Sequence, residues 1–121
     1  MPDKMLMQTV VLTPTFERQA ERAGLSDLAI QDIAAKIAGD PSAGDLIKGS
    51  GGARKLRVAR EGEGKSGGFR TIHYFGGADI LVFLMALIDK RQKANLTKAE
   101  TNELAATLAM IADIYRKGHK P

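Results

Sequence analysis

Three segments with the character of β-strands follow one another in the middle of the chain. Residues 54–60 alternate between apolar and charged side chains, residues 69–75 are rich in aromatic and β-branched residues, and residues 80–88 are wholly apolar. Glycines separate these segments, and strands joined by short connections pair antiparallel. The sequence therefore predicts a small antiparallel sheet, preceded by a loop over residues 42–53.

Signals for the starts of helices stand before and after these strands. Thr13 precedes a proline, and Ser26 precedes isoleucines at helical spacing, so both suit the N-cap of a helix. Thr97 and Glu100 have the spacing of a capping box, which predicts a last helix. Residues 8–12, rich in Val and Thr, are expected to form the first strand. The predicted fold is α+β, in the order β-α-α-β-β-β-α.

The composition is that of one ordinary globular domain, which we expect to span residues 1–121. Apolar residues make up 44% of the chain and charged residues 26%. The absence of cysteine excludes disulfides and thiolate metal sites, and it fits a reducing compartment. The longest apolar run is about half as long as a membrane-spanning helix, and the first residues do not resemble a secretory leader. We therefore expect a cytoplasmic protein that does not enter a membrane.

The positive charge of the chain is concentrated in one segment. Residues 48–73 carry seven basic and two acidic side chains, or +5, whereas the other 95 residues carry eleven basic and twelve acidic side chains, or −1. The segment is rich in arginine, which binds phosphate bidentately, and it holds seven of the thirteen glycines. It is either a solvated basic loop or a phosphate-binding surface.

Cationic side chains from separate strands are expected to meet on one face of the sheet. They are Lys55 and Arg57 on one strand, Arg70 on the next, and Lys90, Arg91 and Lys93 after the last. Fixed Arg and Lys groups stabilise the charge that builds on phosphoryl oxygens when a ribose 2′-hydroxyl attacks the adjacent phosphorus. A lysine among other cations loses its proton more readily and can then accept the 2′ proton. Such a face can cleave RNA without a metal ion, although a plain phosphate-binding surface has the same pattern.

Other chemistries have weaker support in the sequence. The chain has two histidines, His73 and His119, which are too few to suggest a metal site in the absence of cysteine. Residues 62–66 end in the Gly-Lys-Ser of a nucleotide-binding loop but lack the glycine that this motif requires five residues earlier. We therefore expect no cofactor.

Two blocks of sequence resemble the HigB branch of the RelE/ParE toxin superfamily. Residues 49–59 read Gly-Ser-Gly-Gly-Ala-Arg-Lys-Leu-Arg-Val-Ala, and residues 62–75 contain Gly-Gly-Phe-Arg at the start of a strand. Residues 90–97 are also similar to the family, and the likeness runs from about residue 8 to residue 104. The resemblance implies a RelE-like fold and a type II toxin that enters the ribosomal A site and cuts the mRNA there without a metal ion.

The resemblance also implies partners and site residues. The expected partners are a HigA-like antitoxin with a helix-turn-helix domain, and mRNA on the 70S ribosome. Lys55 is expected to assist proton transfer, while Arg57 and Arg70 hold the scissile phosphate. The catalytic candidates are Lys55, Arg57, Arg70, Lys90 and Lys93. The candidates for contact with RNA are Arg54, Lys65, Arg91, His73 and Tyr74, with Lys65 expected to touch ribosomal RNA.

Two other functions fit the same sequence. A ParE-like inhibitor of DNA gyrase shares the fold, and an inactive RNA-binding relative would carry the same cations. Several members of the family have a base-stacking tyrosine near the end of the fourth strand, where this chain has Leu87 and Ile88. Tyr74 or His73 would then have to take its place.

Overall fold

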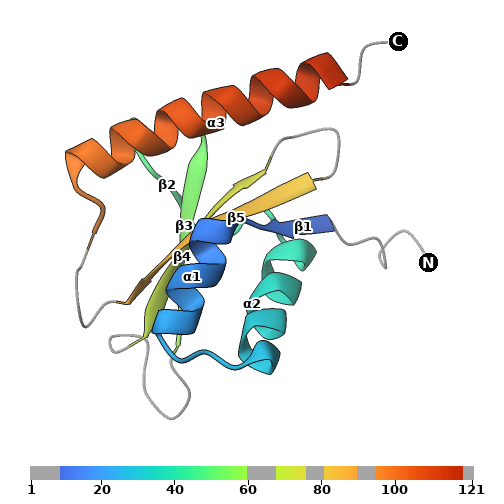
Figure 1. Cartoon of the computed structure of the whole chain (residues 1–121), viewed down its shortest axis with the longest axis vertical. Helices are drawn as coiled ribbons and strands as arrows, with labels where there is room; N and C mark the ends of the chain where they lie inside the picture. The colour runs from blue at the N-terminus through green and yellow to red at the C-terminus, as the bar shows by residue number, and fades with distance from the viewer. Residues whose placement is uncertain (1–8, 60–67, 76–80, 90–94, 119–121) are drawn as a thin grey trace.

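The computed structural model describes residues 9–59, 68–75, 81–89 and 95–118. Its elements confirm the predicted order, with one short strand added (Figure 1). They are β1 (Thr9–Leu12), α1 (Pro14–Arg22), α2 (Asp27–Gly39), β2 (Asp45–Leu46), β3 (Ala53–Val58), β4 (Phe69–Phe75), β5 (Leu81–Asp89) and α3 (Lys98–Gly118). The added strand is β2, which lies in a segment predicted as loop. It forms because residues 45 and 46 pair with residues 55 and 54 of β3.

The strands form one five-stranded sheet in the order β1-β5-β4-β3-β2. β3, β4 and β5 pair antiparallel, as predicted. β1 runs parallel to β5, so the sheet is mixed and not purely antiparallel. Parallel neighbours need a long connection, which the chain between β1 and β5 supplies. The strand that comes last in the sequence therefore lies inside the sheet, between β1 and β4.

A β-bulge interrupts the pairing of β4 with β5. It leaves Met85 between the residues that pair with Ile72 and His73. The extra residue reverses the alternation of β5, so that Leu84 and Leu87 face the same side of the sheet although they are three positions apart.

Helices cover both faces of the sheet (Figure 1). Under α1 and α2 lies a core that includes Phe16, Ile33, Ile37, Phe69 and Leu84. Under α3 lies a second core that includes Ile72, Met85, Ile88 and Leu108. Burial from both sides explains why β5 is apolar throughout and why β4 alternates poorly. Among the described helices, none combines the length and apolar character that crossing a membrane requires.

The predicted caps begin all three helices. The Thr13 hydroxyl accepts the Phe16 N–H at the start of α1 and donates to the Leu84 carbonyl oxygen at 2.8 Å, which ties the helix to β5. The Ser26 hydroxyl accepts the Ala29 N–H at the start of α2. Before α3, the Thr97 N–H donates to Glu100 Oε1 and the Glu100 N–H donates to Thr97 Oγ1, which is a complete capping box.

Candidate active site

Lys55, Arg57 and Arg70, which we call the basic face, lie on the side of the sheet that carries α3. Leu56 and Val58 pack into the core under α1 and α2, so Lys55 and Arg57, which alternate with them in β3, point the opposite way. Arg57 and Arg70 are directly opposite each other in the register of β3 and β4. Directly opposed residues have Cβ atoms about 5 Å apart. The structure thus brings together three of the predicted catalytic residues.

Two arginines in this register are unfavourable for the sheet. Like charges directly opposite each other destabilise a strand pair, by up to about 1 kcal/mol. Arg57 is exposed and Arg70 is half-buried, so water screens the first charge better than the second. A bound phosphate would interact favourably with both guanidinium groups and offset this cost. The arrangement is therefore suited to an anionic ligand.

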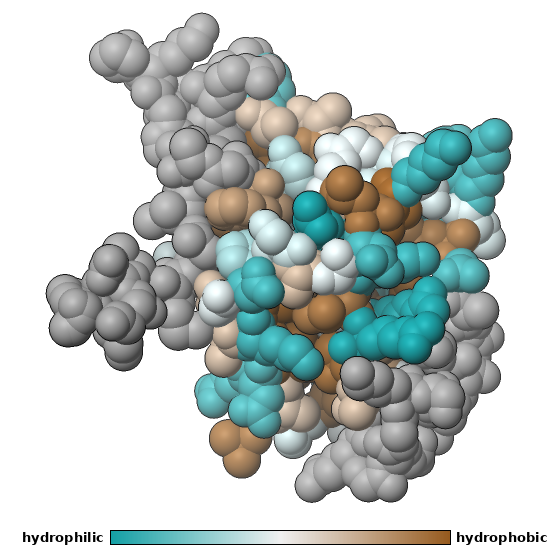
Figure 2. All heavy atoms as spheres, turned by 180° about the vertical axis from the view of Figure 1, so that it is seen from behind, coloured by the Kyte–Doolittle hydropathy of each residue, from teal (hydrophilic) through white to brown (hydrophobic). Residues whose placement is uncertain are grey.

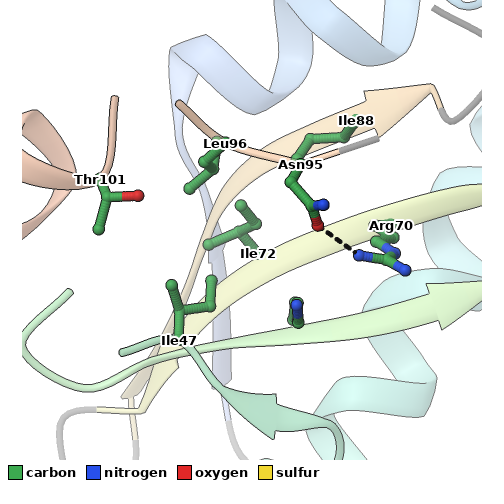
Figure 3. Close-up of a pocket in the computed structure, with 8 residues that line it drawn as sticks. Ile47, Arg70, Ile72, Ile88, Asn95, Leu96 and Thr101 are labelled. Carbon is green, nitrogen blue, oxygen red and sulfur yellow. Dashed lines mark hydrogen bonds between the residues drawn. The ribbon is translucent and has the colours of Figure 1, made fainter. Parts of the chain in front are cut away.

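A hollow of about 180 Å³ opens beside the basic face (Figure 3). Lys55, Arg70, Asn95 and Thr101 contribute polar side chains, and the rest of the lining is aliphatic: Ile47, Ile72, Ile88 and Leu96. Pockets that enclose drug-sized ligands measure roughly 300–1,000 Å³. The hollow is therefore suited to one small group, such as a phosphodiester with part of its ribose.

The surface seen from behind is of mixed polarity. Figure 2 shows hydrophilic side chains gathered around apolar patches, without a uniformly polar face. The hollow has the same mixture, because cations and aliphatic side chains line it together. A nucleotide combines a charged phosphate with a base whose faces stack on apolar groups, so such a mixture can accept both of its parts.

A residue that follows β5 in the sequence binds the side chain of Arg70 through a hydrogen bond. Arg70 Nη1 donates a hydrogen bond of 2.9 Å to Oδ1 of Asn95, and Figure 3 shows the two side chains pointing toward each other. Arg70 Nε is buried and has no hydrogen-bond partner within the described ranges. Asn95 was not among the residues predicted from the sequence. It lies 25 positions from Arg70, and no local pattern connects the two residues.

Two of the predicted RNA contacts, Arg54 and His73, lie on the opposite face of the sheet. They are cross-strand neighbours, and both bind the loop after α2. Arg54 Nη1 donates to the carbonyl oxygens of Ser42 at 3.0 Å and Gly44 at 3.1 Å. His73 is fully buried, and its Nε2 lies 2.9 Å from the Pro41 carbonyl oxygen, to which it donates. The structure therefore separates both residues from the basic face.

Burial sets the protonation of His73. It lowers the pKa of this side chain below the ordinary value of 6.5, and the charge of Arg54 lowers it further. The hydrogen bond to Pro41 and the charge of Asp40 oppose this shift but do not outweigh it. The imidazole is therefore neutral near pH 7, with its proton on the nitrogen that faces Pro41.

The remaining predicted residues fall into two groups. Tyr74 is half-buried and packs against the core under α3, on the same side of the sheet as the basic face. Four candidates lie outside the described residues: Lys65, Lys90, Arg91 and Lys93. Within the described ranges, His, Asp and Glu side chains form no group of three or more that could hold a metal ion.

A larger groove of about 860 Å³ lies against α2 and the end of β3. Most of its lining is apolar, including Leu28, Ile33, Val58 and Phe69, and the charged residues in it are Asp32 and Lys36. One cation beside one carboxylate gives no net attraction for an anion. The smaller hollow at the basic face is therefore the better candidate for a site that binds phosphate.

Two comparisons with known proteins bear on the family and the fold of this chain. Residues 8–118 match the family model described as the RelE toxin of the RelE/RelB toxin–antitoxin system. The fold is similar to the solved structure of a mutant of the E. coli toxin RelE in the free state, with a TM-score of 0.50 and 13% sequence identity. The similarity covers 84% of this chain and 96% of that one. The family match extends over nearly the whole chain, and the chain therefore belongs to the RelE family of toxins from toxin–antitoxin systems.

Proposed function

We propose that this chain is a ribosome-dependent endoribonuclease that cuts mRNA in the ribosomal A site and thereby inhibits translation. One observation carries the proposal: Arg57 and Arg70 oppose each other on neighbouring strands, with Lys55 beside them at the hollow. Three cations on one face are suited to an RNA backbone. Membership of the RelE toxin family supports this reading.

The proposed reaction is an intramolecular transesterification. The ribose 2′-oxygen attacks the adjacent phosphorus, and the bond from phosphorus to the 5′-oxygen breaks. Lys55 assists the transfer of the 2′ proton to a water molecule, and the leaving 5′-oxygen takes a proton from Lys90 or Lys93, which follow β5 in the sequence. The products are a 2′,3′-cyclic phosphate and a 5′-hydroxyl. Arg57 and Arg70 stabilise the charge on the non-bridging oxygens.

We also propose the antitoxin partner and the RNA contacts of this chain. The block Gly-Ser-Gly-Gly-Ala-Arg-Lys-Leu-Arg-Val-Ala at residues 49–59 supports assignment to the HigB branch, whose antitoxin is HigA-like and carries a helix-turn-helix domain. Lys65, Arg91 and Tyr74 are proposed to touch RNA, and Tyr74 lies on the same side of the sheet as the basic face. We leave Arg54 and His73 out of the proposed site because they bind the loop after α2.

The test is expression in cells together with primer extension on cellular mRNA. Wild-type protein is expected to stop growth and to leave cuts at fixed positions within codons. Lys55→Ala and Arg70→Ala are each expected to slow cleavage by about 100–1,000-fold, the usual effect of removing one group that stabilises a developing charge. Lys36→Ala removes an exposed lysine from α2 and is the matched control, which should stay toxic.

The outcomes of this test distinguish the proposed nuclease from a misplaced site, from a gyrase inhibitor and from an inactive relative. Far-UV circular dichroism must show that the variants are folded. Full toxicity of both Lys55→Ala and Arg70→Ala would show that the site is misplaced. Intact mRNA together with DNA damage would indicate a ParE-like gyrase inhibitor, and a harmless wild-type protein would indicate an inactive RNA-binding relative.

A further inference from the structure

We infer that Asn95 is a positioning residue, whose side-chain oxygen fixes the guanidinium of Arg70 in the orientation that holds the scissile phosphate. This inference rests on the proposed function and adds a residue to its site. Asn95 itself is not proposed to take part in bond making. Its role is to restrain the direction in which Arg70 presents its remaining N–H groups.

The hydrogen bond between the two side chains is the first argument. Arg70 Nη1 donates to Asn95 Oδ1 at 2.9 Å, with the charged group as donor (Figure 3). Hydrogen bonds to a charged group are stronger than neutral ones. Arg70 Nε has no partner within the described ranges, so it does not anchor the group. The bond from Nη1 is thus the described contact that sets the rotation of the guanidinium.

The anchoring of Asn95 is the second argument. The next residue, Leu96, packs against the core under α3. The residue after that is Thr97, which closes the capping box with Glu100. A side chain that positions another must itself be held by its surroundings, and Asn95 is placed by the start of α3.

The charge of the basic face is the third argument. Arg57 repels the guanidinium of Arg70 from the opposite position on β3. An amide oxygen restrains Arg70 against this repulsion without adding a negative charge. A neutral acceptor therefore leaves the positive charge of Arg70 available to a phosphate.

The test compares Asn95→Ala with Asn95→Asp, which keeps an acceptor oxygen at the same position. In single-turnover cleavage of mRNA on purified ribosomes, we expect Asn95→Ala to lower the rate about tenfold, which corresponds to about 1.4 kcal/mol. Affinity for the programmed ribosome should change less than about twofold. Asn95→Asp keeps the acceptor but adds a negative charge beside Arg70, so its rate should lie between the rates of Asn95→Ala and the wild type. Asn102→Ala removes an exposed asparagine from α3 and is the matched control.

A double variant separates positioning from direct action. Arg70→Lys keeps the positive charge but lacks the planar fork that Asn95 orients. In this background, Asn95→Ala should cause no further loss of rate, because the two effects are not independent. A further tenfold loss would show that Asn95 acts on the substrate directly and would overturn the inference. Wild-type rates in Asn95→Ala would also overturn it.

A second readout does not depend on cleavage. The guanidinium protons of Arg70 should give a resolved NMR signal in the wild type, because the hydrogen bond slows their exchange with water. That signal should be lost in Asn95→Ala and retained in Asn95→Asp and Asn102→Ala. If wild-type protein fails to cut mRNA, the proposed function fails, and the NMR signal still decides the role of Asn95. Its persistence in Asn95→Ala would refute positioning.

Discussion

Replacing Arg57 by a neutral residue is expected to raise the stability of the fold and to lower the rate of RNA cleavage. Arg57 faces Arg70 in the strand register. Two unit charges about 7 Å apart repel each other by about 0.6 kcal/mol in water, and by about 2.4 kcal/mol at an effective dielectric constant of about 20. Because Arg57 is exposed, the lower figure applies. We therefore expect Arg57→Gln to raise the free energy of unfolding by about 0.5 kcal/mol, within the range for cross-strand pairs.

The measurement is thermal unfolding of Arg57→Gln beside Arg57→Lys, which keeps the charge and most of the length. For a chain of this size, about 0.5 kcal/mol corresponds to a Tm difference of about 2 °C. The difference should shrink in about 1 M salt, where the Debye length falls to about 3 Å. Cleavage by Arg57→Gln should be at least about 100-fold slower. Equal Tm values for the two variants at low salt would refute the argument that the two arginines repel each other.

Three further predictions concern stability. Burial lowers the pKa of His73, so the unfolded chain binds more protons than the folded chain below about pH 6.5. The free energy of unfolding, measured by urea titration, should therefore decrease as the pH is lowered below this value, and it should decrease less in His73→Gln. Gly44 has a φ of +87°, and a Cβ there would collide with the Lys55 carbonyl oxygen, so Gly44→Ala should cost more than about 2 kcal/mol in the same assay. Thr97→Ala removes the cap of α3 and should lower the free energy of unfolding by about 1 kcal/mol.

Features governed by neighbouring residues were predictable from the sequence. Thr13, Ser26 and Thr97 cap the helices as predicted, because capping depends on side chains within a few residues of the helix start. β4 has the predicted bounds. β5 was predicted at residues 80–88 and is observed at Leu81–Asp89. It could be recognised because a strand that is buried on both faces is apolar at nearly every position.

Features that depend on distant residues were not predictable. The parallel pairing of β1 with β5 joins residues 72 positions apart, and nothing in residues 9–12 specifies that partner. The contact between Arg70 and Asn95 depends on how α3 packs, which composition does not show. Arg54 is a different case. Its position in the alternation of β3 groups it with Leu56 and away from Lys55, so the sequence contained the signal that separates it from the basic face.

The position of β5 has a consequence for protein synthesis. Translation delivers β1 before the other four strands of the sheet and β5 after them, yet β5 is the neighbour of both β1 and β4. Until residues 81–89 have left the exit tunnel, β1 has no partner strand, and β4 lacks support on one side. Pairings between such distant residues form slowly. The sheet that carries Lys55, Arg57 and Arg70 is therefore incomplete until β5 has emerged from the ribosome.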